Sequence, residues 1–78
     1  MEMQIQTTLE AIILMELGQR IKQLRINKGI TQTNFSITCN MEKSSMSKIE
    51  SGKVNISYLT LMRLSKCLEV SAKELCGN

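Results

Sequence analysis

The sequence predicts an all-α domain with short connections between its helices. It contains no Pro and only four Gly among 78 residues, so few positions interrupt a helix. Apolar residues recur at intervals of three and four in several segments, as in a helix that is buried on one side. A chain of this length forms one domain with a small core, and self-association is the support that we expect for it.

The first clearly amphipathic segment is 17–27, LGQRIKQLRIN, in which Leu17, Ile21 and Leu24 share one face. Gly29 is suited to the left-handed position that ends such a helix. The segment therefore predicts a helix that packs one face on the core and ends just before Gly29.

Two shorter helices are predicted next. Thr31 is suited to cap the first of them, and Asn40, which tolerates positive φ, is suited to the turn between them. The second runs from about Glu42 to Ser51 and stops at Gly52. The side chains expected to point inward are Phe35, Ser36 and Cys39 in the first helix, and Met46 and Ile49 in the second.

The remainder of the chain predicts a loop over 53–56 and two final helices. Ser57 can cap the longer of these, and Val70-Ser71 opens a last short turn that runs through Leu75. The inward stripe expected on the longer helix consists of Tyr58, Leu61, Leu64 and Leu68.

The first sixteen residues allow two interpretations. Between Glu10 and Leu17 the segment AIILM is apolar on every side, unlike a helix that has one solvent-exposed face. One interpretation is a helix that begins near Thr8 and buries its spare face in a second subunit. The other is a disordered or strand-like tail, MEMQIQTT. In both cases residues 1–16 form an N-terminal extension of a domain at 17–78.

Composition argues against several classes of protein. There is no His, and Cys39, Cys67 and Cys76 lack the close pairs of a zinc site, so neither a metal nor a cofactor is expected. With no signal peptide before them, we expect reduced thiols in a cytoplasmic protein. Phe35 and Tyr58 are too few aromatic residues for stacking on single strands. No apolar run reaches the roughly 18 residues of a membrane span. No nucleophile–base pair or Gly-rich phosphate loop is visible, so an enzyme is not expected.

From Leu17 to Leu75 the chain resembles the XRE family, the phage-repressor or Cro-like helix-turn-helix proteins. The matching pieces are LGQRIKQLR, GITQTNF, SKIESGK and LTLMRLSKCLEVSAKEL, in one unbroken register. The resemblance implies a five-helix lambda-repressor-like DNA-binding domain in which the second and third helices form the DNA-reading unit. The chain has Ser36 where the family usually has Ala, Asn40 for Gly and Ile56 for Pro. None of these departures threatens the fold.

The resemblance also implies the residues that contact DNA. The family's residue at Gln32 binds a phosphate and braces the reading helix, and an amide has the donors and the acceptor for both. Lys can donate to guanine, and Ser can donate or accept. The implied base-reading set is Lys43, Ser44, Ser47 and Lys48; the residues suited to the sugar-phosphate backbone are Ser45, Lys53 and Asn55. Each could instead be an ordinary solvated residue, but no carboxylate lies among the four base-reading positions, which favours DNA.

Arg25 and Glu50 have a different predicted role. In the family these positions form a partly buried ion pair that ties the first helix to the third. We expect a structural role for both residues, since no second acid and no His accompanies Glu50 for metal binding or catalysis.

The favoured function is a sequence-specific regulator that binds double-stranded DNA, of the repressor or restriction-modification controller type. The net charge of +3 fits a phosphate partner. Phage repressors, restriction-modification controllers and toxin–antitoxin partners share this domain, and the sequence does not choose among them. The alternative is a protein-interaction module, such as an antitoxin-like partner, that uses the fold without specific DNA binding.

The resemblance implies a homodimer, since the family commonly dimerises through the end of the fold that carries Leu59 and Met62. A two-fold dimer would set two reading helices about 34 Å apart, which suits a palindromic operator. The subunit contacts considered are Leu59, Met62 and the AIILM segment, which do not fit the inward stripes. Ile37 is a further apolar residue at a usually polar position, and scattered exposed residues of this kind are common.

Overall fold

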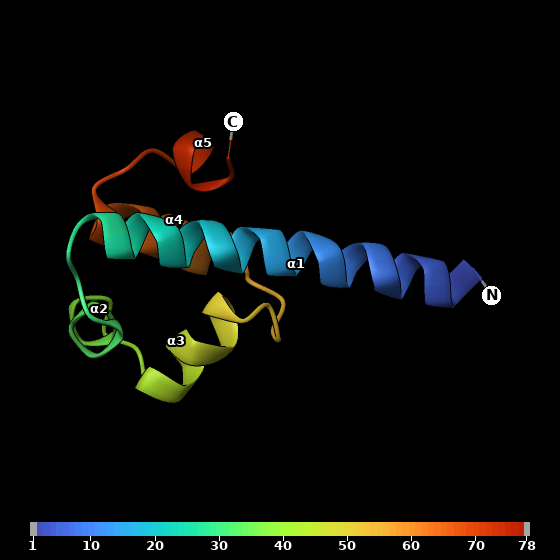
Figure 1. The fold of residues 1–78 in the computed structure, drawn as a ribbon, viewed down its shortest axis with the longest axis horizontal. Coiled ribbons are helices and arrows are strands. Elements are labelled where there is room, and N and C mark those ends of the chain that lie inside the picture. The colour runs from blue at the N-terminus through green and yellow to red at the C-terminus, as the bar shows by residue number, and fades with distance from the viewer. Residues whose placement is uncertain (1, 78) are drawn as a thin grey trace.

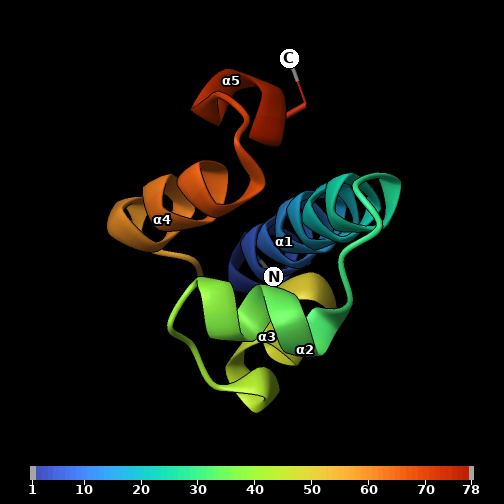
Figure 2. The same cartoon turned by 90° about the vertical axis from the view of Figure 1, so that its left-hand side faces the viewer.

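Five helices make up the fold. The computed structural model describes residues 2–77, with side chains from Leu9 onward. The helices are α1 (Glu2–Asn27), α2 (Gln32–Thr38), α3 (Lys43–Glu50), α4 (Tyr58–Leu68) and α5 (Ala72–Leu75). Residues 2–77 contain no strand. The long α1 passes between the α2–α3 pair on one side and α5 on the other, with α4 alongside (Figures 1 and 2). The all-α, five-helix prediction is confirmed.

The first helix begins earlier than the sequence pattern indicated. It starts at Glu2 rather than near Thr8 or at Leu17, and the stretch read as a possible strand-like tail is helical from residue 2. No Gly or Pro precedes Gly18, so nothing in this stretch interrupts a helix. The N-terminal half of α1 projects beyond the other four helices (Figure 1).

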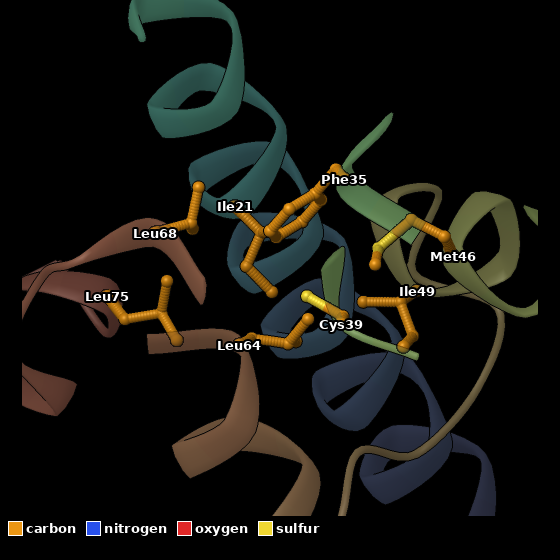
Figure 3. Close-up of a cluster of buried hydrophobic side chains, with 8 residues drawn as sticks. All are labelled: Ile21, Phe35, Cys39, Met46, Ile49, Leu64, Leu68 and Leu75. Atoms are coloured by element: carbon orange, nitrogen blue, oxygen red, sulfur yellow. The ribbon is translucent and has the colours of Figure 1, made fainter. Parts of the chain in front are cut away.

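The core is a single cluster to which every helix contributes. Figure 3 shows its eight buried side chains gathered between the helices: Ile21, Phe35, Cys39, Met46, Ile49, Leu64, Leu68 and Leu75. The inward positions predicted in α2 and α3 are confirmed. In α4, Leu64 and Leu68 are buried, whereas Tyr58 is 72% exposed and was wrongly placed in the stripe. Tyr58 is the first residue of α4, and helical side chains lean toward the N-terminus, so this ring extends past the core.

The predicted caps and turns are present. The hydroxyl oxygens of Thr31, Ser57 and Ser71 accept hydrogen bonds from backbone N–H groups three residues ahead, at 3.0–3.1 Å. Asn40 adopts a φ of 55° in the α2–α3 turn, as its tolerance of positive φ predicted. Glu69 takes a similar φ of 57° at the end of α4, which the sequence had not indicated.

Three apolar residues that did not fit the predicted inward stripes differ in their exposure. Ile37 is 70% exposed and Leu59 is 78% exposed. Met62, expected on the outer side of α4, is instead half-buried. None of the described helices combines the length and the hydropathy that crossing a bilayer requires.

Candidate nucleic-acid interface

The position of α3 is set by close contact with α1. A Cβ atom added to Gly18 would lie 2.5 Å from the carbonyl oxygen of Ile49 and 2.7 Å from that of Glu50, so the two backbones touch at this point. Met46 and Ile49 bury the same side of α3 in the core. Because one side is fixed against α1 and the core, the opposite side faces solvent.

The outer side of α3 is polar and cationic. Lys43, Ser44, Ser47 and Lys48 are all exposed, as predicted from their spacing. Within the described chain none of these four side chains makes an intramolecular hydrogen bond or ion pair, so their donors and acceptors are directed to solvent. Their role in DNA binding stays a prediction.

A buried carboxylate joins three helices behind this outer side. Arg25 of α1 donates from Nε to Glu50 Oε2 at 2.8 Å and from Nη2 to Oε1 at 3.1 Å, which confirms the predicted ion pair. Arg25 Nη1 also donates to the carbonyl of Ile30, at 2.7 Å. Gln32 of α2 donates from Nε2 to Glu50 Oε1 at 3.1 Å. Glu50 therefore links α1, α2 and α3. The hydrogen bond from Gln32 stabilises the position of α3 relative to α2.

The loop after α3 adds polar groups at one end of the helix. A hollow of about 280 Å³ lies between α3 and this loop, and its polar lining consists of Ser45, Lys48, Asn55 and Thr60. Ser45 is half-buried at the rim, while Asn55 is exposed. Lys53 is exposed nearby in sequence but does not line the hollow.

A second hollow, of about 350 Å³, lies at the junction of α1, α2 and α3. It is lined by Gln19, Lys22, Gln32, Ser47, Glu50 and Ser51. The structure thus places Lys22 and Gln19 of α1 beside Gln32 and Ser47, two of the residues predicted to contact DNA. Sequence reasoning had assigned Lys22 no role. The available signal was its position three residues before Arg25, on the same flank of the helix.

Comparison with known proteins matches the chain, over residues 18–76, to the model of a family described as a helix-turn-helix domain. The chain belongs to this helix-turn-helix family. The match includes α2, α3 and the loop between them, and it ends within one residue of α5. The residues assembled around α3 are therefore those of a helix-turn-helix domain.

Two relatives and one solved structure illustrate the family. Control protein C.BamHI of Bacillus amyloliquefaciens is 32% identical over 59 residues, which cover 74% of this chain and 73% of the relative. Control protein C.MunI of a Mycoplasma species is 31% identical over 64 residues, which cover 81% of this chain and 86% of the relative. The crystal structure of the restriction-modification controller protein C.AhdI from Aeromonas hydrophila superposes with a TM-score of 0.77 at 29% identity, covering 80% of this chain and 94% of that one.

Proposed function

We propose that this helix-turn-helix protein is a sequence-specific transcriptional regulator that reads the major groove of double-stranded DNA with α3. The observation that carries the proposal is the exposed Lys and Ser side of α3, held outward by the Arg25–Glu50–Gln32 contacts. The major groove admits a helix and presents a different donor and acceptor pattern for each base pair. A short helix with free Lys and Ser side chains can engage that pattern without first breaking contacts of its own.

Base contacts are assigned to the outer side of α3. Lys43 and Lys48 donate to guanine O6 and N7, and Ser44 and Ser47 donate or accept according to the base. The short Ser side chains let the helix backbone approach the base edges closely. These four residues determine the sequence preference in this proposal.

Phosphate contacts are assigned to the residues around α3. Gln32, Ser45, Lys53 and Asn55 flank the helix, and Lys22 adds a cation beside Gln32. Such contacts fix the position of the protein on the duplex without reading its sequence. The carboxylate of Glu50 lies in the same region, but the paired guanidinium of Arg25 offsets its charge and so lowers its repulsion of phosphate.

The biological setting is proposed from the relatives. C.BamHI and C.MunI are named control proteins, and C.AhdI is named a restriction-modification controller. We infer the same setting here, with a homodimer bound to a palindromic operator. A two-fold dimer presents two reading helices about one turn of DNA apart, which explains why an operator repeats its half-site.

Selection of bound sites from a library of random duplexes tests this proposal. The expected result is one enriched motif with two inverted half-sites. A Lys43→Ala/Lys48→Ala double variant should lose the motif. A Lys66→Ala/Lys73→Ala variant, which removes the same charge from exposed positions in α4 and α5, should keep it. Failure of the unmodified protein to enrich any sequence would refute specific DNA binding.

A further inference from the structure

Glu42 stands at the start of α3, and its carboxylate has no partner within the described chain. It occupies the N-cap position, but its side chain accepts no hydrogen bond from the backbone of the helix. The hydroxyls at the starts of α2, α4 and α5 each accept such a bond, at 3.0–3.1 Å. Glu42 is exposed, and the ion pair found among residues 2–77 joins two other side chains. The carboxylate of Glu42 is therefore available to a ligand.

The main chain around Glu42 is fixed, although its side chain is not. The N–H of Met41 donates to the carbonyl of Ser36 at 2.8 Å, and the N–H of Met46 donates to the carbonyl of Glu42 at 3.0 Å. Met41 is half-buried and packs against the core. The turn thus determines where the Glu42 side chain begins, and its carboxylate is left to meet whatever lies in front of α3.

The place of Glu42 in the fold is that of a residue which meets bases. The start of α3 lies at the edge of the molecule away from α1 (Figures 1 and 2). When the second helix of a helix-turn-helix unit enters the major groove, its N-terminal residues contact the base edges. Lys43 and Ser44, to which base contacts are assigned above, follow Glu42 directly in the chain. Glu42 therefore comes within reach of the same base edges.

The charge of Glu42 excludes a contact with phosphate. Residues 17–68 contain nine Lys or Arg and two acidic residues, Glu42 and Glu50. Arg25 pairs with Glu50 and offsets its charge, whereas no cation of the described chain pairs with Glu42. A carboxylate is repelled by a phosphate at short range. The group on a duplex that suits Glu42 is a hydrogen-bond donor on a base.

The major groove offers two such donors. The amino groups at N4 of cytosine and N6 of adenine donate, whereas O6 and N7 of guanine and O4 of thymine accept. An ionised carboxylate accepts only, so it is attracted to the amino groups and repelled by the keto groups. Adenine places the acceptor N7 beside its amino group, where it faces the second carboxylate oxygen. Cytosine places an apolar C5–H there, so cytosine is the favoured base.

We infer that Glu42 is a specificity-determining residue whose carboxylate accepts a hydrogen bond from the 4-amino group of one cytosine in each half-site. The inference rests on the proposed function, in which α3 reads the major groove, and it adds an acidic contact to the cationic ones. Lys43 donates to guanine, so these two adjacent side chains read opposite kinds of hydrogen-bonding group.

The same carboxylate lowers the affinity for other sequences. Where Glu42 meets no amino group, it loses water without gaining a hydrogen bond and it faces acceptors of its own sign. Specificity can come from such unfavourable contacts with the wrong partner as well as from favourable contacts with the right one. Glu42 thus weakens binding to unrelated duplexes more than binding to the operator.

Site selection followed by titration of single operators tests the inference. The unmodified protein should enrich a motif with cytosine at one position of each half-site, and guanine or thymine there should weaken binding roughly tenfold. Glu42→Ala should bind operators with any of the four bases at that position about equally, and should bind unrelated duplexes more tightly. Glu42→Gln, whose amide both donates and accepts, should prefer adenine. Glu74→Ala removes the same charge from an exposed position in α5 and should keep the cytosine preference.

An operator analogue isolates the hydrogen bond itself. Pyrimidin-2-one in place of the selected cytosine lacks the 4-amino group. This replacement should weaken binding of the unmodified protein roughly tenfold and should change binding of Glu42→Ala little, because coupled groups do not act additively. Equal losses for the two proteins would show that Glu42 does not contact the amino group.

Three further results would overturn the inference while DNA binding stands. The first is a cytosine preference that survives in Glu42→Ala. The second is a uniform gain in the affinity of Glu42→Ala for all sequences, which would make the carboxylate repulsive only. The third is a lower melting temperature for Glu42→Ala with unchanged base preference, which would mean that the charge serves only the N-terminus of α3. If the unmodified protein enriches no sequence at all, the proposed function fails and this inference fails with it.

Discussion

The carboxylate of Glu50 accepts two hydrogen bonds from Arg25 across the α1–α3 contact, and the exposed fractions of the two side chains are only 3% and 9%. This pair is shielded from water, unlike an exposed ion pair, which contributes between 0 and about 1 kcal/mol. Loss of one partner leaves the other charge buried without compensation.

Glu50→Ala should therefore lower the free energy of unfolding by about 3–5 kcal/mol. For a domain of this size each kcal/mol corresponds to about 4–8 °C in melting temperature, so thermal unfolding will report the change. Glu42→Ala is the matched control, because Glu42 is exposed and its side chain makes no capping hydrogen bond. Equal melting temperatures for the two variants would contradict the structural role of Glu50.

Gly18→Ala should destabilise the fold although Ala is the better helix former. Helix propensity alone favours Ala by about 0.5–1 kcal/mol. The added Cβ, however, would lie 2.5 Å from a backbone oxygen of α3, and overpacking of this kind costs about 1–3 kcal/mol. Urea unfolding gives the sign of the change in unfolding free energy for Gly18→Ala. Gln19→Ala, at an exposed neighbouring position, is the control. A gain in stability at Gly18 would mean that α1 and α3 are not in backbone contact.

Gln32→Ala should weaken DNA binding more than it weakens folding. It removes the proposed phosphate contact and the brace from α2 to Glu50, but Arg25 still pairs with the carboxylate. Titration of a fluorescent operator gives the dissociation constant, and a melting curve gives the stability. Thr33→Ala, at the next and exposed position of α2, serves as the control and should bind with unchanged affinity.

Lys43 and Lys53 should differ in the kind of binding energy that they supply. Substitution of Lys43 or of Ser44 should relax preference at one base position by about 1–3 kcal/mol. Lys53→Ala should weaken binding to every sequence alike and reduce the salt dependence by about 0.9 log unit per log of salt. Affinities for a set of single-base operator variants at two salt concentrations separate the two effects. A uniform loss from all three substitutions would show that α3 does not read bases.

The buried thiol of Cys39 predicts a loss of stability in alkaline solution. Burial, and secondarily a hydrogen bond with the Cys67 thiol, raises the pKa of Cys39 well above its ordinary value. The unfolded chain then loses this proton at a lower pH than the folded protein does. The free energy of unfolding should thus be insensitive to this thiol below about pH 8.5 and fall as the pH rises further. As the pH rises, the melting temperature should fall less for Cys39→Ala than for the unmodified protein. Cys76→Ala, at an exposed position, should behave like the unmodified protein.

Local chemistry made much of this fold predictable. Thr31, Ser57 and Ser71 each mark a helix start by themselves, because the capping interaction spans only three residues. Asn40 could be assigned to the turn because few other side chains tolerate its φ. The start of α1 was missed because its first half has no apolar stripe, so periodicity gave no signal there.

The candidate site was harder to predict in its long-range contacts. The outward side of α3 follows from helical spacing, but the contact between Gln32 and Glu50 joins residues 18 positions apart. Lys22 shares a flank of α1 with Arg25, but its place beside Ser47 depends on the crossing of α1 over α3, and it was missed for that reason. Tyr58 was misplaced because periodicity alone does not show where a helix meets the edge of the core.

The free side chains on the outside of α3 have a consequence for how this protein can change over time. The contacts that hold α3 in place lie on its inner side and at Glu50, and the side chains of Lys43, Ser44, Ser47 and Lys48 make no hydrogen bond or ion pair within the described chain. Mutations at these four positions can accumulate without a penalty in folding. On the proposed base contacts, the same scaffold could thus be retargeted to new operators, so that a regulator and its recognition site diverge together while the architecture is inherited unchanged.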